Sequence, residues 1–185
     1  QNKTWGSTHR AFHKGRAALF LLQKGCVTMD NKVANLINEQ INKELYSAYL
    51  YLDFANYYAA AGLDGFENWY RIQAQEERDH AMLFYQYLHN NGEPVVFEAI
   101  EKPDWTRGDN MTPLIKGLEH EKYVTSLINN IYAAAYEARD FRTMQVLDWF
   151  VKEQGEEEKN ASDMITKMEL FGSDSKGLYM LNNEL

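Results

Sequence analysis

The sequence is poor in cysteine, with Cys26 alone among 185 residues, and it has no long apolar run. A single cysteine excludes an intrachain disulfide and a cluster of cysteine ligands, and it suits a reducing compartment. No run approaches the about 20 apolar residues that a membrane span needs. Residues 17–22 are too few, and lack the cleavage pattern, for a secretory signal. We therefore expect a cytoplasmic protein with no membrane partner.

Motifs for nucleotide binding and hydrolysis are absent as well. The chain has no glycine-rich phosphate loop and no local signature of a serine–histidine–aspartate triad. Acidic residues outnumber basic ones by 27 to 19, which gives a formal charge of −8. This balance argues against nucleic acid as the main partner and suits cations, although ordinary solubility is the commoner reason for such a charge.

The charge is divided unevenly along the chain. Residues 1–28 hold five basic residues and no acidic one, so residues 29–185 carry −13. Met29 reads as a natural start. A transit peptide would be acid-poor like residues 1–28 but also serine-rich, and only Ser7 is present. We expect residues 1–28 to be an extension, tag-derived, transit-like or translated from upstream, and residues 29–185 to form one domain.

Beyond residue 31 the hydrophobic pattern is helical, with almost no strand signal. Asn31 can cap the first helix, and Asn91-Gly92 and Gly172 can end later ones. The pattern predicts four long helices, over about 31–61, 64–90, 112–138 and 141–171. A short fifth helix is expected after Gly177.

The connections predict how these helices are arranged. Short turns make the first two helices, and the last two, antiparallel pairs. Residues 91–111 contain two glycines and two prolines and predict an irregular connection. It is long enough to travel the length of the bundle, which makes the second and third helices parallel. The fold class is therefore all-α, a four-helix bundle with one long crossover.

Each long helix has an apolar stripe that an acid interrupts near its middle. On the second helix, Glu77 and His80 are three residues apart and share the apolar face. The other interrupting acids are Glu44, Glu121 and Glu157. Four converging carboxylates would repel one another unless cations bound them, and two divalent ions would cancel their charge. Oxygen-rich ligation with one imidazole suits iron or manganese better than zinc.

A second group of acids lies beside the first, with Glu76 on the second helix and others on the fourth. Glu153, Glu156 and Glu157 share a face by i, i+3 and i+4 spacing. A solvated helix face and a third, more exposed cation site are both consistent with this spacing.

Two aromatic residues and one histidine lie close to these acids in the pattern. Tyr51, two turns beyond Glu44, and Trp149 are either electron donors near the metals or ordinary core residues. His120 adjoins Glu121 but faces another direction and has no partner at metal spacing.

Four segments and the C-terminal region resemble ferritins, most closely the prokaryotic non-haem type. The matching segments are residues 38–47 (NEQINKELYS), 74–80 (AQEERDH), His120-Glu121, 153–159 (EQGEEEK) and Gly177-Leu178-Tyr179. Ferritin-like proteins are the known example of this ligand pattern in a bundle. The resemblance covers residues 29–185 and identifies them as a ferritin-like di-iron domain with a short fifth C-terminal helix.

The resemblance also implies a role for each residue. Glu44, Glu77 and His80 would hold a first iron, and Glu77 would bridge to a second iron held by Glu121 and Glu157. Gln154 would lie near the second iron, and Tyr51 matches the tyrosine beside the centre. The acids that resemble ligands of the third iron site of prokaryotic members are Glu76, Glu153, Glu156 and Glu157.

Two departures separate neighbouring families. Bacterioferritins have Glu-x-x-His where this chain has Gln154-x-x-Glu157, and their haem-binding methionine is replaced by Arg78, so no haem is expected. Rubrerythrins need cysteine-rich modules that one cysteine cannot supply.

The function implied is iron storage with ferroxidase activity. Fe(II) would be oxidised by dioxygen or peroxide at the dinuclear centre, and ferric oxyhydroxide would be deposited inside a homo-oligomeric shell of 24 subunits. One alternative is a di-metal oxidase acting on an organic substrate. Another is a structural shell or metal buffer without oxidation chemistry.

Overall fold

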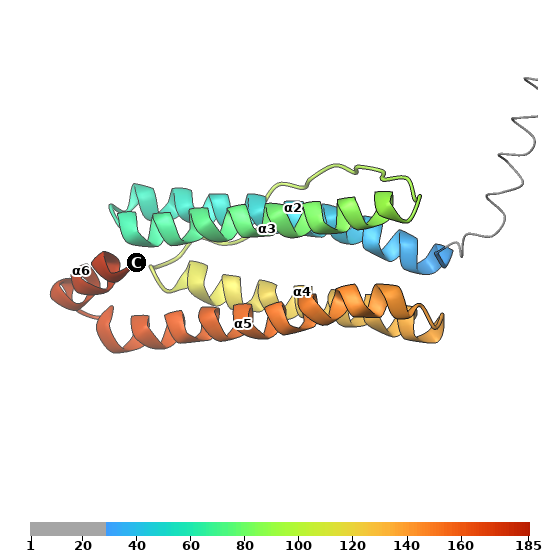
Figure 1. Ribbon diagram of the computed structural model, residues 1–185. Helices are drawn as coiled ribbons and strands as arrows, with labels where there is room; N and C mark the ends of the chain where they lie inside the picture. The colour runs from blue at the N-terminus through green and yellow to red at the C-terminus, as the bar shows by residue number, and fades with distance from the viewer. Residues whose placement is uncertain (1–28) are drawn as a thin grey trace, which may run out of the picture.

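The computed structural model describes residues 29–185, and the regular structure in this part is helical (Figure 1). The helices are α2 (Asn31–Ala60), α3 (Asp64–Asn90), α4 (Thr112–Glu137), α5 (Phe141–Phe171) and α6 (Ser175–Glu184). Within the described range, no helix is both long and apolar enough to cross a membrane. The extension expected over residues 1–28 lies outside the described residues. The all-α prediction is confirmed.

The starts of α2 and α6 differ from the prediction. Asp30 caps α2 in place of Asn31, and its carboxylate accepts hydrogen bonds from the N–H groups of Lys32 and Val33 at 2.9 and 3.3 Å. Aspartate and asparagine cap helices about equally well, so the sequence did not choose between them. Helix α6 begins at Ser175, before the expected Gly177, because the Asp174 carboxylate caps its first turn.

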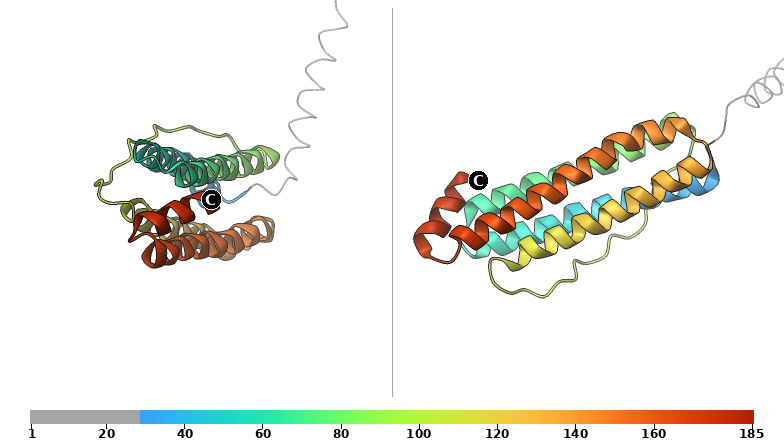
Figure 2. Two further views of the ribbon diagram at one scale, coloured as in Figure 1. Left: turned by 90° about the vertical axis from the view of Figure 1, so that its left-hand side faces the viewer. Right: turned by 90° about the horizontal axis from the view of Figure 1, so that it is seen from below.

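The helices form two antiparallel pairs, α2 with α3 and α4 with α5 (Figures 1 and 2). Residues 91–111 run back along the bundle, so α3 and α4 point the same way, as predicted (Figure 1). Side chains of α2 hold this crossover. Asn38 exchanges two hydrogen bonds with the backbone of Val96, and Asp53 accepts from Trp105 Nε1 at 2.8 Å and from Arg107 at 3.0 Å.

A layer of polar side chains divides the core into two apolar clusters. One cluster includes Ile37, Phe84, Ile128 and Phe150, and the other includes Phe54, Phe66, Leu114 and Met164. Between them, near mid-helix, lie the buried polar residues Gln40, Glu44, Ser47, Gln73, Glu77, His80, Glu121, Gln154 and Glu157. The predicted interruptions of the four stripes are therefore buried at one level of the bundle.

Helix α6 closes one end of the bundle against α3. The Asn182 side-chain oxygen accepts hydrogen bonds from the N–H groups of Gly65 and Phe66, at 2.9 and 3.4 Å. These groups belong to the first turn of α3, which has no partner within its own helix. A Cβ atom on Gly65 would lie 1.8 Å from the main-chain carbonyl oxygen of Asn182, so only glycine permits this approach.

Candidate metal centre

Helices α2 and α3 bring three potential ligands together in the polar layer. Glu44 on α2 and Glu77 and His80 on α3 each offer one ligand atom, and these atoms lie within 4.8 Å of one another. His80 Nδ1 is 3.5 Å from Glu77 Oε2. All three side chains are buried, which makes them unlike an ordinary surface acidic group. We call these three residues the first half of the centre.

One oxygen of the first half has no protein partner. Gln40 donates to Glu44 Oε1 at 2.9 Å, but Glu44 Oε2 accepts no hydrogen bond. Among the described residues it is the only fully buried side-chain nitrogen or oxygen without a partner. Leaving such an acceptor unpaired costs about 1–3 kcal/mol, more if it is charged. A cation bound between Glu44, Glu77 and His80 would remove that cost.

Helices α4 and α5 supply the second half of the centre, Glu121 and Glu157, and neutral side chains hold it. Glu121 accepts hydrogen bonds from the Tyr51 hydroxyl and from Gln154 Nε2, the latter at 3.1 Å. Gln73 on α3 donates to Glu157 Oε2 at 2.7 Å. The second half thus has hydrogen-bond partners even without a cation.

A small enclosed cavity touches the second half. Its lining includes Tyr51, Tyr70, Gln73, Glu121 and Glu157, and the space open to water-sized molecules is about 10 Å³. That is roughly enough for one water molecule. The cavity can therefore admit about one water molecule beside the carboxylates, but not an organic substrate.

Burial and mutual repulsion raise the pKa values of all four carboxyl groups. Burial and then the charge of Glu77 raise the pKa of Glu44 well above its usual value. Burial and then Glu121 do the same for the pKa of Glu77, and they raise the pKa of Glu157 to about 7. Burial also raises the pKa of Glu121, although its hydrogen bonds from Tyr51 and Gln154 oppose the shift. Without a cation these groups resist full ionisation at neutral pH, whereas bound cations would favour it.

Besides the buried Glu157, the acids expected to form a third site are Glu76, Glu153 and Glu156, which are more exposed than the rest of the polar layer. We call these three residues the outer acids. Glu76 is largely exposed. The part of its carboxyl group that is shielded from solvent, together with the nearby Glu153, raises its pKa, while His80 opposes the shift. Glu156 forms a surface ion pair with Lys152 at 3.0 Å and is 56% exposed. The charges of Glu76, Glu153 and Glu157 are thus close enough to interact, whereas Glu156 is engaged elsewhere.

The two aromatic candidates occupy different environments. Tyr51 is buried and touches Glu121, so it packs in the core and reaches the centre at once. Trp149 is 43% exposed, and its interpretation as a core residue is wrong. It lies one position before the buried Phe150, which turns it toward the surface, and its ring packs edge-on to His80 with 5.5 Å between centroids.

Sequence reasoning missed two buried glutamines and the hydrogen bond of His120. Gln40 and Gln73 each lie four residues before a predicted ligand, and this spacing was the available signal. The Ser47 hydroxyl shares a 2.7 Å hydrogen bond with His120 Nε2 and lies 3.0 Å from the Lys43 carbonyl oxygen. Burial, followed by the charge of Lys43, lowers the pKa of His120 to about 4, which keeps the imidazole neutral.

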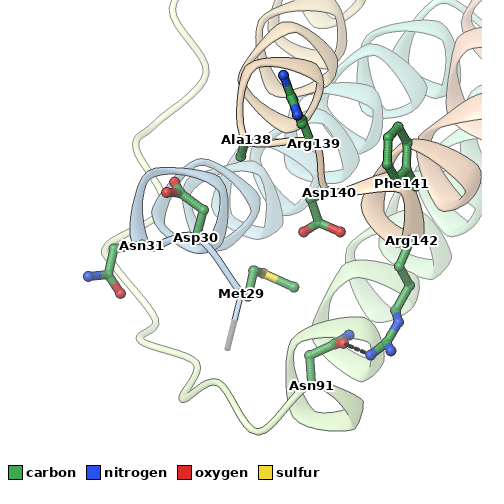
Figure 3. A pocket seen from close by; sticks show the side chains of 9 residues that line it. All are labelled: Met29, Asp30, Asn31, Asn91, Ala138, Arg139, Asp140, Phe141 and Arg142. Atoms are coloured by element: carbon green, nitrogen blue, oxygen red, sulfur yellow. Dashed lines mark hydrogen bonds between the residues drawn. The ribbon is translucent and has the colours of Figure 1, made fainter. Parts of the chain in front are cut away.

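Three larger cavities lie away from the centre, and one of them, of about 420 Å³, lies between α4 and α5. Another, of about 630 Å³, opens at the end of the bundle where α2 begins, and its lining includes Met29, Asp30, Asn91 and Arg142 (Figure 3). Arg142 donates to the Asn91 side chain across it at 2.9 Å (Figure 3). The third, of about 470 Å³, lies between α2, α4 and the crossover beside His120. None of the three is lined by a predicted metal ligand.

Comparison with known proteins gives one consistent result. The model of the ferritin-like domain family matches residues 34–171. The bacterial non-heme ferritin of Campylobacter jejuni is 33% identical over 152 residues, which cover 82% of this chain and 91% of that protein. The corresponding ferritin of Staphylococcus saprophyticus is 33% identical over 157 residues, 85% of this chain and 94% of its own length.

Solved structures give the same result. An engineered closed form of the ferritin of Archaeoglobus fulgidus is 39% identical, with a TM-score of 0.82, over 84% of this chain and 95% of that one. The open-pore ferritin of the same archaeon has the same identity and TM-score, over 85% and 96%.

Proposed function

The chain belongs to the ferritin family, and from this premise we propose that it stores iron and oxidises Fe(II) as the metal enters. In this proposal iron is the substrate. The buried carboxylates form a transient dinuclear centre, and dioxygen or peroxide is the oxidant.

The observation that carries the proposal is the unpartnered Glu44 Oε2. It lies in a buried group with Glu77 and His80, whose ligand atoms are all within 4.8 Å. A hydrogen-bond donor on a neighbouring helix would also satisfy that oxygen, yet among the described residues no such donor reaches it. Carboxylate oxygens with one imidazole are a donor set that iron accepts.

The protein's own groups would act in the following way. Glu44, Glu77 and His80 hold one Fe(II), and Glu77 bridges to a second held by Glu121 and Glu157. Each Fe(II) loses one electron, and one dioxygen accepts both electrons with two protons to form hydrogen peroxide. Carboxylate ligands stabilise Fe(III) more than Fe(II), because their negative charge interacts more strongly with the higher ionic charge.

The ferric product would then leave the centre and become mineral. Each Fe(III) reacts with two water molecules to give FeOOH and three protons. The relatives are ferritins, and we propose that this chain likewise assembles into a hollow shell, of 24 subunits, around the mineral. The acidic residues of the described part would help to draw cations inward.

A di-metal oxidase with an organic substrate is the alternative from another class. Such an enzyme needs a cavity that joins the substrate to the metals. The cavity beside Glu121 and Glu157 has room for about one water molecule, which favours a small oxidant.

The test is to add Fe(II) in air to the assembled apoprotein and to follow ferric absorbance and particle mass. Uptake of far more than three irons per chain supports storage, and uptake of two or three only would contradict it. Glu44→Ala should slow the first oxidation phase about 100-fold, because it removes a direct ligand. Glu39→Ala, on the exposed face of the same helix, is the matched control and should oxidise iron normally.

A further inference from the structure

Glu157 lies between the buried centre and the outer acids. It could bind a metal ion together with either group of carboxylates. On its inner side it shares the small cavity with Glu121 and Tyr51. On its outer side it feels the charge of Glu76, which in turn feels that of Glu153. The orientation of one side chain can therefore determine whether its carboxylate serves the buried centre or the outer acids.

Gln73 fixes that orientation. Its amide nitrogen donates to Glu157 Oε2 at 2.7 Å, from α3 across to α5. Both residues are buried, with 8% and 5% of their surface exposed, and both line the inner cavity. Neither Glu76 nor Glu153 lines that cavity. The hydrogen bond thus holds Glu157 on the side of Glu121.

We propose that Gln73 is a positioning residue that holds Glu157 at the buried centre and thereby sets how entering metal is divided between the centre and the outer acids. The inference rests on the proposed function, because it takes Glu157 as a metal ligand.

The chemistry of the contact supports this role. A carboxylate has two oxygens, and Gln73 occupies only Oε2, so Oε1 remains for a metal ion. Partners that hydrogen-bond a ligand orient it, and their loss typically lowers metal affinity about 10- to 100-fold. Without the amide, a buried Glu157 oxygen would lose its partner, and rotation toward the more hydrated outer acids would restore its solvation.

Gln40 offers a matched comparison within the same layer. It is also a buried glutamine, 2% exposed, and it donates to a predicted ligand, Glu44 Oε1, at 2.9 Å. Glu44 belongs to the first half, and none of the outer acids is among the groups that shift its pKa. Loss of the Gln40 amide should weaken the first half and leave the outer acids unaffected.

The experiment compares Gln73→Met and Gln40→Met with the wild type, using assembled apoprotein and Co(II), which air does not oxidise at these ligands. Anomalous diffraction from crystals equilibrated with graded Co(II) gives the occupancy of each position separately. In Gln73→Met we expect Co(II) binding at Glu121 and Glu157 to weaken about 10- to 100-fold. Binding at Glu76 and Glu153 should be unchanged or stronger, with Glu157 turned outward.

The controls separate positioning from general damage. Gln40→Met should weaken Co(II) at Glu44, Glu77 and His80 and not at the outer acids. If Gln73→Met weakened every position equally, its role would be structural and the proposal would be overturned. Unchanged occupancy beside Glu121 would overturn it too. Should Gln73→Met fail to assemble, Gln73→Leu, which also lacks the amide, is measured with the same criteria.

The same data distinguish this inference from the proposed function. Wild-type protein with no Co(II) at the buried group would overturn both. Normal wild-type occupancy with an unchanged Gln73→Met variant would overturn the inference alone. Redistribution of Co(II) in a protein that does not oxidise Fe(II) would support the inference and contradict the ferroxidase function.

Discussion

The two halves of the centre differ in how their oxygen atoms are satisfied. In the first half, Glu44 keeps one buried oxygen without a partner, beside Glu77 and the imidazole of His80. In the second half, Tyr51 and Gln154 hold Glu121, and Gln73 holds Glu157. A metal ion entering the first half removes an existing penalty, whereas one entering the second half must compete with the hydrogen bonds that Tyr51 and Gln154 already make to Glu121.

The difference between the two halves bears on how tightly each would hold iron. Other things being equal, the half that is unsatisfied without metal binds more tightly, and the half with ready substitutes releases metal more easily. Storage requires that iron leave the centre after oxidation, so a loosely holding half is useful.

Among the variants, His80→Ala should change the difference in metal affinity between the two halves most. The variant removes the nitrogen ligand of the first half and leaves the hydrogen bonds of Glu121 and Glu157 in place. We expect Co(II) affinity at the first half to fall about 100-fold and affinity at the second half to change less than tenfold. Visible absorption of Co(II) during titration measures both. His89→Ala, exposed at the end of the same helix, is the control, and an equal loss at both halves would contradict the assignment.

Tyr51→Phe should make the second half resemble the first. It leaves a Glu121 oxygen without its donor, which should lower the unfolding free energy of the apoprotein by about 1.5–3 kcal/mol. Saturating Co(II) should recover most of this loss, because the metal takes the freed oxygen. Thermal unfolding with and without Co(II) tests the prediction, with Tyr49→Phe, half exposed on the same helix, as control. A loss that Co(II) does not reduce would show that the hydroxyl is not exchanged for metal.

Glu157 should make both the stability of the apoprotein and metal binding at the second half depend on pH. Its folded pKa is raised to about 7 from 4.5, so the native state binds more protons than the unfolded state in that window. Stability of the apoprotein from this group is therefore complete below pH 4.5 and declines as the pH rises toward 7. Metal binding has the opposite dependence, because cations displace the proton.

Co(II) affinity at the second half should accordingly rise about tenfold per pH unit for each proton displaced, and level off above pH 7. Isothermal titration at pH 5.5, 6.5 and 7.5 measures the slope. Glu157→Gln removes the titrating group and should flatten the dependence. A slope equal to that of the wild type would assign the proton to another carboxyl group.

The bundle could be predicted well because helices and turns are determined by patterns of residues that are close together in the sequence. Apolar spacing near 3.6 residues, together with glycine and proline at the turns, gave α2 to α5 and the crossover. The mid-helix acids were visible as exceptions to that spacing, and Glu44, Glu77 and His80 do come together. Their role as iron ligands stays a prediction.

What the sequence could not give depends on contacts between helices. Gln73 meets Glu157 across 84 residues, and no periodicity within α3 reveals which helix its amide will face. Trp149 shows a related limit. Consecutive residues of a helix are rotated by about 100°, and this rotation separates the buried Phe150 from the partly exposed Trp149. The prediction of Asn31 as the cap failed for a smaller reason, because the neighbouring Asp30 can cap the helix equally well.

The contact between Asn182 and Gly65 has a consequence for protein engineering. Removal of residues 182–185 would uncover the first N–H groups of the helix that carries Glu77 and His80, and any side chain at position 65 would push α6 away. Trimming or redesigning this end therefore disturbs the start of the helix that carries two of the proposed metal ligands. Modifications that must leave the chemistry untouched are better placed on exposed faces of α2.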